Sequence, residues 1–195
     1  GATTTRRRFL QGSAAITVGS ASGLLVGFHV PALAAEGDTQ ELNAWVLIQP
    51  DETVVIRIAR SEMGQGTLTG LAQLVAEELE CDWARVRTEY PTPGQNLARN
   101  RVWGSFSTGG SRGIRESHDY VRKGGAIARL MLVQAAADEW QVAAAECTTA
   151  RGQILHKASG RSTSYGRVAA SAAKLTPPTE VKLKEASAWT LAGRP

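Results

Sequence analysis

The sequence predicts an α+β fold in which helices pack on one face of a small sheet. Short β-branched or alternating runs and longer amphipathic runs follow one another as ββαβ, a long polar connection, and αββα. The hydrophobic fraction of 43% and the charged fraction of 21% are typical of a globular protein. Without the N-terminal segment described below, roughly 160 residues remain, enough for one domain with its own core.

The first two strands form a predicted hairpin. Residues 43–49 and 53–59 are rich in Val, Ile and Leu, and Arg57 alternates with apolar neighbours in the second run. Residues 50–52, Pro-Asp-Glu, are typical of a tight turn because proline presets φ at the first turn position. We therefore expect two neighbouring strands here.

A helix is predicted from Thr67, its expected capping residue, to about Glu80. Apolar residues recur at helical spacing and fall on one face of it; they are Leu68, Leu71, Leu74, Val75 and Leu79. The acidic residues Glu77, Glu78 and Glu80 are expected to lie mostly away from that face. A third strand follows at 86–90, where prolines end it.

Residues 91–113 form a polar, glycine-rich connection, and connections of this length are usually functional or disordered. Trp103 is the tryptophan in it that could line a ligand entry. A second helix is predicted from Ile114 to Trp140. Gly124-Gly125 inside it predicts close packing or a break, because each glycine costs about 1 kcal/mol relative to alanine.

The last part of the domain is predicted as a short hairpin over 147–156 and a third helix from its cap Ser164 to Leu175. Residues 176–195, which contain two adjacent prolines, are expected to be an extended connector. The predicted organisation is therefore an N-terminal segment at 1–35, a domain at 36–175 and the connector.

The net charge of +4 does not indicate a nucleic-acid partner, because much of the excess lies in Arg6, Arg7 and Arg8 and no basic stripe with interleaved aromatics occurs.

Cys81 and Cys147 have no CxxC neighbour, so the chain alone cannot hold an iron–sulfur cluster. Two separate buried thiols are favoured, with a single disulfide as the alternative. No histidine pair has ligand spacing, and no metal site is expected.

The N-terminal segment predicts a twin-arginine export signal and therefore a periplasmic location. A basic cluster at 6–8 is followed by Phe9-Leu10 and a mildly apolar run, and small residues flank a cleavage point after Ala34. A transmembrane anchor is the alternative, but the run contains Ser, Thr, several Gly and His29, which makes it a poor span. If retained, the signal would tether the protein to the membrane.

The tract 61–67, Ser-Glu-Met-Gly-Gln-Gly-Thr, lies where a strand pattern ends and a helical pattern begins. Two glycines flank Gln65, so the backbone of Gly64 and Gly66 can approach a ligand while one amide points at it. Met63 belongs to the same contact loop. The alternative is a polar turn that caps the helix. Glu62 as a catalytic base is disfavoured, because nothing nearby in sequence would orient it or remove it from water.

A second loop, Thr108-Gly109-Gly110-Ser111, also leads into a predicted helix. Two such loops offer backbone N–H groups and partial positive charge to an anion, and phosphate or pyrophosphate is the natural ligand. The alternative for this loop taken alone is a flexible connector.

These residues resemble the molybdopterin-binding subunit of the xanthine dehydrogenase/aldehyde oxidase family. The similarity lies in Glu62-Met63-Gly64-Gln65-Gly66, in 69–72 and 74–79, in Trp83 and in Thr108-Gly109-Gly110-Ser111. It is greatest for the twin-arginine-exported branch, which contains isoquinoline 1-oxidoreductase β-subunits and membrane-bound aldehyde dehydrogenase large subunits. The fold implied is the N-terminal part of a molybdopterin-binding domain.

The resemblance implies a molybdenum hydroxylase that oxidises an aldehyde or N-heterocycle with oxygen taken from water. Gln65 would be the catalytic amide that donates to an oxygen ligand of molybdenum, and the cofactor, molybdopterin or its cytosine dinucleotide, would supply the redox chemistry. Met63, Gly64, Gly66 and the four residues of the second loop would bind the cofactor.

The chain is shorter than members of that branch, so it is expected to be inactive alone and to need the remaining molybdopterin-binding domains, in the same gene product or a second chain. An iron–sulfur subunit, with or without a cytochrome c subunit, is implied as the electron partner. Two alternatives stay open: a non-catalytic periplasmic interaction module that keeps the fold without the cofactor, and an unrelated phosphate-binding domain.

Overall fold

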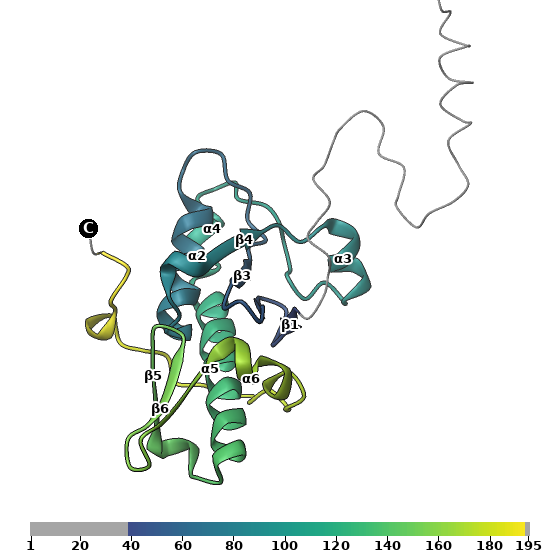
Figure 1. Ribbon diagram of the computed structural model, residues 1–195. Helices are drawn as coiled ribbons and strands as arrows, with labels where there is room; N and C mark the ends of the chain where they lie inside the picture. The colour runs from purple at the N-terminus through teal and green to yellow at the C-terminus, as the bar shows by residue number, and fades with distance from the viewer. Residues whose placement is uncertain (1–38, 194–195) are drawn as a thin grey trace, which may run out of the picture. The chain divides into compact units, whose positions relative to one another are not determined.

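The computed structural model describes residues 39–193, which lie within one compact unit. The predicted export signal at 1–35 lies outside the described residues. Figure 1 shows the order of the helices and strands along the chain. The helices and sheets bear out the predicted α+β class, although the strands form two sheets and one was predicted.

The first sheet has four strands in the order β1-β2-β3-β4. They are β1 (Gln40–Glu41), β2 (Val46–Ile48), β3 (Val54–Arg57) and β4 (Val86–Glu89). β2 and β3 are antiparallel, with Val46 opposite Ile56 and Ile48 opposite Val54, which confirms the predicted hairpin. β4 is parallel to β3, because the intervening helix carries the chain back across the sheet before the strand begins.

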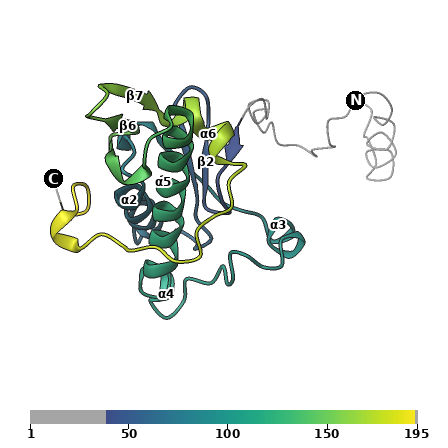
Figure 2. The same cartoon turned by 90° about the horizontal axis from the view of Figure 1, so that it is seen from below.

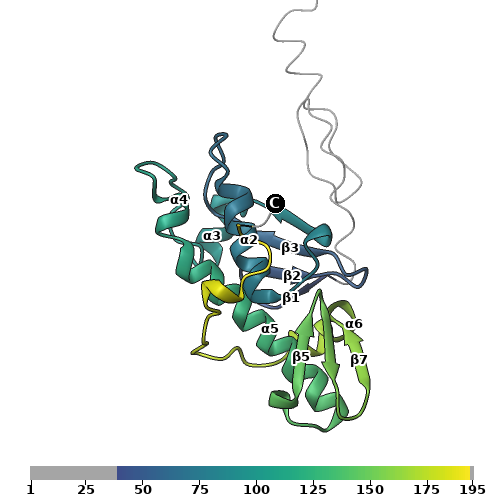
Figure 3. The same cartoon turned by 90° about the vertical axis from the view of Figure 1, so that its left-hand side faces the viewer.

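Two helices, α2 (Thr67–Leu79) and α5 (His118–Trp140), pack side by side on the sheet (Figures 1 and 3). Gly124 and Gly125 permit this approach within an unbroken α5. A Cβ on Gly124 would lie 2.9 Å from the Trp45 ring, and one on Gly125 would lie 2.4 Å from the Val75 carbonyl oxygen. The close packing predicted from the paired glycines is therefore confirmed, and the alternative of a break at this point is not seen.

A second sheet lies at the far end of α5 with the order β5-β6-β7 (Figures 2 and 3). β5 (Cys147–Ala150) and β6 (Gln153–His156) form the predicted hairpin. β7 (Arg161–Ser164) was not predicted, because its polar side chains carry no strand pattern. It leads into α6 (Tyr165–Ala172), which begins where expected, although the Ser164 side chain makes no capping hydrogen bond.

The connection 91–113 is not structureless. It contains α3 (Pro93–Ala98), where the Thr92 hydroxyl accepts from the Gln95 N–H and Gln95 bonds back to Thr92. Trp103 is 2% exposed, and its indole N–H donates to the Ala44 carbonyl oxygen at 2.9 Å. This tryptophan packs inside the domain and does not line a ligand entry.

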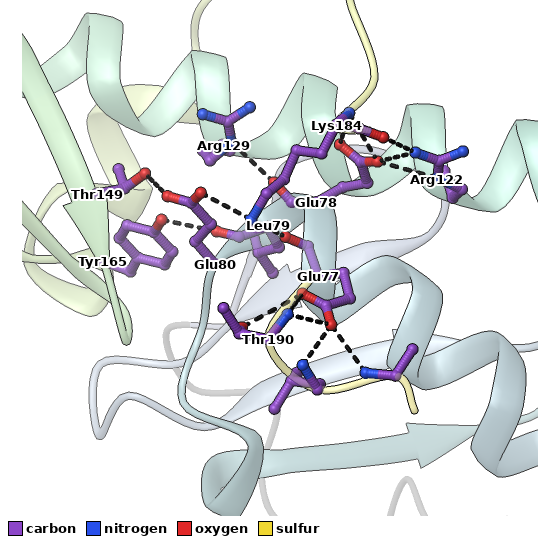
Figure 4. Close-up of polar contacts among 12 residues, drawn as sticks. Glu77, Glu78, Leu79, Glu80, Arg122, Arg129, Thr149, Tyr165, Lys184 and Thr190 are labelled. Atoms are coloured by element: carbon purple, nitrogen blue, oxygen red, sulfur yellow. Dashed lines mark hydrogen bonds and ion pairs between the residues drawn. The ribbon is translucent and has the colours of Figure 1, made fainter. Parts of the chain in front are cut away.

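The acidic residues predicted to lie away from the apolar face of α2 are not all at the surface. Glu77 and Glu78 are 1% and 0% exposed, because α5 and residues 184–192, here called the C-terminal strap, cover that side of the helix. Glu78 accepts from Arg122 of α5 at 2.7 Å, and Glu80 accepts from Lys184 Nζ at 2.9 Å. Figure 4 shows these carboxylates reaching their partners.

Glu77 holds the strap by its backbone. Its carboxylate accepts from the N–H groups of Thr190 and Ala192, each at 2.8 Å, and from that of Leu191. Burial by itself would raise the pKa of Glu77, but these N–H groups outweigh it and hold the pKa below its ordinary value. The part of the predicted connector at 184–192 is thus fastened to the domain.

Cys81 and Cys147 are both free thiols, as the favoured alternative predicted. Cys81 is buried, which raises its pKa to about 12, whereas Cys147 is only partly buried. Across residues 39–193, no helix combines the length and apolar character that crossing a membrane requires.

Candidate functional site

The first loop joins the end of β3 to α2 and is organised by the carboxylate of Glu62. That carboxylate accepts from the backbone N–H groups of Gly64 at 2.6 Å, Gly66 at 2.9 Å and Leu68 at 2.9 Å. The predicted cap Thr67 is instead the first residue of the helix, and Gly66 precedes it with φ of 80°. A side chain from four residues upstream therefore satisfies N–H groups that a helix start leaves free.

This use of Glu62 argues against its role as a base. The N–H groups of Leu68 and Gly66 are the largest causes that hold its pKa below the ordinary value of 4.5. A carboxylate that is stabilised in its charged form takes up a proton less readily. The expectation that nothing orients Glu62 was wrong. Glu62 is still disfavoured as a base, now because its charged form is stabilised.

Gln65 is held in one orientation. Its Nε2 donates to the Ser61 carbonyl oxygen and to the Thr67 hydroxyl, each at 2.9 Å, and its Oε1 accepts from the Met63 N–H at 2.6 Å. The Ser61 carbonyl oxygen can only accept and the Met63 N–H can only donate, so a flipped amide would lose both of these bonds, whereas the Thr67 hydroxyl can take either role. The donor end of the amide is therefore fixed.

The second loop differs from its prediction at the helix that follows it. Ser111 has φ of 55°, and α4 (Arg112–Arg115) is a single turn that ends before α5 begins. The predicted start of one long helix at Ile114 was therefore wrong. Because a helix of one turn has a small dipole, the positive charge near this loop comes mainly from its arginines. Arg112 donates to the Gly109 carbonyl oxygen at 2.8 Å, and Arg115 lies 3.4 Å from that of Gly110.

The two loops meet through side chains. Gln65 Nε2 also lies 3.3 Å from the hydroxyl oxygen of Thr108. Gly113 of α4 makes this meeting possible, because a Cβ there would lie 2.8 Å from the Thr67 hydroxyl and 3.0 Å from that of Thr108. The structure thus brings the two predicted loops together from positions 43 residues apart in the chain.

Backbone on the first loop is accessible from outside. Gly64 and Gly66 have φ of 95° and 80°, and a Cβ on either would meet no heavy atom within 4 Å. Met63, at the tip, is 73% exposed, which is unusual for a large apolar side chain. The arrangement offers one fixed amide donor and two nearby guanidinium groups to an anionic ligand. The glycines permit close approach, but the N–H groups of Gly64 and Gly66 already donate to Glu62.

Two cavities of the described residues lie away from the two loops. One of about 490 Å³ lies between the end of α2, β5 and the strap, and its lining includes Cys81, Trp83 and Leu191. Another, of about 430 Å³, is lined by α5 and the chain after α6. None of their lining residues belongs to either loop. An open surface is consistent with a ligand that other domains also contact.

The sequence did not predict the roles of several residues at the site. Thr67 and Gly113 carry no motif of their own, and their role arises from contact between distant segments. Arg60 and Arg112 also lie against the second loop. The signal that could have found Glu62 is its spacing of two, four and six residues before the N–H groups that it accepts from.

Within residues 39–193, no group of three or more His, Cys, Asp or Glu side chains is placed to hold a metal ion. His156 is 4% exposed and lies 3.2 Å from Glu146, and His118 lies 3.1 Å from Asp119. Both histidines have protein partners.

Comparison with known proteins identifies relatives over most of the chain. The isoquinoline 1-oxidoreductase subunit β of Brevundimonas diminuta is 39% identical over 176 residues, which cover 85% of this chain and 22% of that protein. The membrane-bound aldehyde dehydrogenase (pyrroloquinoline-quinone) of Gluconacetobacter polyoxogenes is 31% identical over 159 residues, which cover 76% of this chain and 20% of that protein. The chain thus spans about a fifth of the length of these relatives.

A solved structure shares the fold. A Cu,Mo-CO dehydrogenase matches with a TM-score of 0.50 and 18% identity, over 63% of this chain and 15% of that one. Quinoline 2-oxidoreductase from Pseudomonas putida 86 matches with a TM-score of 0.49 and 22% identity, over 69% of this chain and 17% of that one. A family model described as the molybdopterin cofactor-binding domain matches residues 5–195, and this chain therefore belongs to that family.

Proposed function

We propose that this chain forms the part of a molybdenum hydroxylase in which the Gln65 amide and the second loop contact the molybdopterin cofactor. The observation that carries the proposal is the meeting of the two loops, with Gln65 Nε2 3.3 Å from Thr108. Family membership supports molybdopterin as the ligand. It also removes the alternative of an unrelated phosphate-binding domain.

The residues present fit such a cofactor. A pterin dithiolene with a phosphate arm needs close backbone approach at one end and positive charge at the other. The open backbone of Gly64 and Gly66 offers the first, and Arg112 and Arg115 beside Gly109 and Gly110 offer the second.

When bound, the cofactor would supply the redox chemistry, and the protein supplies orientation and electrostatics. Gln65 would donate one N–H to it. An amide nitrogen carries two hydrogens but faces three oxygen acceptors, so the longest of these bonds, to Thr108, is the one that a stronger acceptor would replace. A donor already held in place costs little reorganisation at the moment of reaction.

We further propose that the substrate is an aldehyde or an N-heterocycle, since the names of the two relatives point to these classes. The remaining molybdopterin-binding domains and an iron–sulfur subunit, with or without a cytochrome c, would complete the enzyme in the periplasm. The chain alone should then be inactive, and turnover by the purified 195-residue chain would refute this part of the proposal.

Cofactor analysis of the assembled complex tests the proposal. Near-stoichiometric molybdenum and an extractable pterin are expected. Absence of both would favour the alternative, a non-catalytic interaction module, and pyrroloquinoline quinone in place of a pterin would also contradict the proposal.

The Gln65→Ala variant tests the residue. Turnover should fall sharply while the thermal unfolding midpoint changes little, because an exposed loop amide contributes little to the core. The matched control is Gln134→Ala, an exposed glutamine on α5 whose amide donates to the Asp138 carboxylate at 2.7 Å. Undiminished turnover in Gln65→Ala would remove Gln65 from the mechanism.

A further inference from the structure

Arg60 is a buried cation beside the site. It is 5% exposed and directly precedes Ser61, the residue whose carbonyl oxygen accepts from Gln65. The cofactor contacts proposed above do not use it, and a charged side chain is rarely so buried unless its hydrogen bonds are made. Its partners therefore indicate what it does.

The guanidinium group of Arg60 reaches three groups. Nε donates to the Ser117 hydroxyl oxygen at 2.9 Å, and Nη1 donates to the Ser107 carbonyl oxygen. Nη2 lies 3.6 Å from a Glu116 carboxylate oxygen. Ser117 is itself 0% exposed and its hydroxyl also accepts from Tyr120 at 2.6 Å, so the anchor at this end is rigid.

These partners lie at both ends of one segment. Ser107 immediately precedes Thr108, while Glu116 and Ser117 follow α4 and precede α5. Between them lie the second loop and the one-turn helix. One planar group thus holds the beginning and the end of the segment that carries the second loop, and it does so from the chain that begins the first loop.

We propose that Arg60 is a positioning residue that fixes the second loop against Gln65; the benefit to cofactor binding rests on the proposed function. The planar guanidinium group suits this task, because its five N–H donors can contact a carbonyl, a hydroxyl and a carboxylate at the same time. A lysine at this position keeps the charge but presents a single ammonium group. It cannot bond both ends of the segment in the same geometry.

The segment depends on such an outside anchor. Gly109 and Gly110 lower its backbone stiffness, and residues 109–112 are exposed, so few buried contacts oppose local opening. Loss of the guanidinium would also leave the Ser107 carbonyl oxygen without this donor. The second loop should then open more often while the sheet and the two long helices stay closed.

Hydrogen exchange on the full chain tests the inference without any cofactor. In Arg60→Lys and Arg60→Met, amides of residues 105–111 should exchange about tenfold faster or more, since a lost charged hydrogen bond changes opening by that order. Amides of β5–β7 should be unchanged. The milder variant Ser117→Ala removes the Nε acceptor and should give a smaller increase at the same amides, which covers the case in which an Arg60 variant does not fold.

Arg122→Met is the matched control. Arg122 is also buried, at 8% exposed, but it pairs with Glu78 and donates to the Lys184 carbonyl oxygen. Its loss should accelerate exchange in the strap and leave residues 105–111 unchanged. Equal acceleration at 105–111 in the Arg122 and Arg60 variants would show general destabilisation and overturn the inference.

A double-mutant cycle in the assembled complex separates this inference from the proposed function. If Arg60 acts through the second loop, molybdenum retention should fall in Arg60→Lys, and fall less than additively when Thr108→Val is already present. Unchanged exchange at 105–111 in folded Arg60→Lys would overturn the inference even if molybdenum is bound. Faster exchange at 105–111 in a complex that contains no molybdenum would instead sustain the positioning role and remove the proposed function.

Discussion

The amide nitrogen of Gln65 lies 3.3 Å from the hydroxyl oxygen of Thr108, a residue 43 positions further along the chain. This contact links two glycine loops that leave different elements, β3 and the connection after α3. It is the longest of the three contacts of that nitrogen. The link is therefore close enough to orient the amide and weak enough to be exchanged for a ligand.

The first prediction concerns Thr108→Val, which keeps the shape of the side chain and removes the hydroxyl. In the loaded complex this hydroxyl would be released from Gln65 and would bond to the cofactor. Loss of one such hydrogen bond is worth about 0.5–1.5 kcal/mol, so molybdenum should be retained about threefold to tenfold less tightly by the assembled complex. Exposed Thr69 on α2 provides the matched control, Thr69→Val. Equal metal retention in the two variants would show that the Thr108 hydroxyl does not contact the cofactor.

The second prediction uses the left-handed backbone of Gly66. Alanine at this position costs about 1–2 kcal/mol of backbone strain, and the same cost applies to Gly160, where φ is 67° and a Cβ would also meet no atom within 4 Å. Gly66→Ala and Gly160→Ala should thus lower stability similarly in denaturant titrations.

The cofactor content should separate these two glycine variants. Only Gly66→Ala places a methyl group on the surface that the proposed cofactor contacts, so only this variant should lose molybdenum from the purified complex. Equal molybdenum content in the two variants would contradict the assignment of the first loop.

The third prediction is a pH dependence of the first loop. The pKa of Glu62 is below its ordinary value of 4.5 in the folded chain, with the Leu68 and Gly66 N–H groups as the main causes. Its contribution to order is then fully present above pH 4.5 and is lost as the pH falls through the lowered pKa. Exchange protection of the Gly66 and Leu68 amides should fall in that window.

Glu62→Gln serves as the comparison for the pH experiment. The neutral amide has no charge to titrate, so protection at Gly66 and Leu68 should already be lower at neutral pH and should show no step on acidification. A step of the same size in this variant would mean that another group controls the loop.

The fourth prediction concerns the strap. Glu77→Ala removes the acceptor of three backbone N–H groups, which should destabilise the domain by about 2 kcal/mol or more and expose residues 184–192 to protease. Glu139→Ala, an exposed glutamate on α5, is the control. Resistance of the strap to protease in Glu77→Ala would show that its other contacts suffice.

Much of the fold was predictable because its signals are local. The β2–β3 hairpin follows from β-branched runs around a proline turn, and α2 follows from apolar residues at helical spacing. The helix α3 was missed although Thr92, Pro93 and Gln95 form a capping box with proline at the first helical position. The polar composition of residues 91–113 predicted a loop, although the capping box predicts a helix.

The burial of Glu77 and Glu78 could not be predicted from periodicity. Their partners lie in α5 and in the strap, and the contacts between Glu77 and Thr190 span 113 residues. A glutamate is expected to be solvent-exposed unless it has buried partners, and nothing in the neighbouring sequence identifies such partners here. Trp103 was misjudged for the same reason, since the Ala44 carbonyl oxygen that it binds lies 59 residues away.

Both loops of the candidate site were found because glycines next to polar residues mark exposed backbone wherever they occur. Their meeting was not predicted, since it depends on Gly113 fitting against Thr67 and Thr108. The anchoring of the second loop by Arg60 was likewise hidden, because an arginine at the end of a strand pattern is more often solvent-exposed.

The most direct measurement is a density map of the assembled, cofactor-loaded complex. The account predicts a pterin whose atoms lie within hydrogen-bond distance of Gln65 Nε2 and whose phosphate arm lies against the backbone of Gly109 and Gly110. A map in which the pterin contacts neither loop would contradict it.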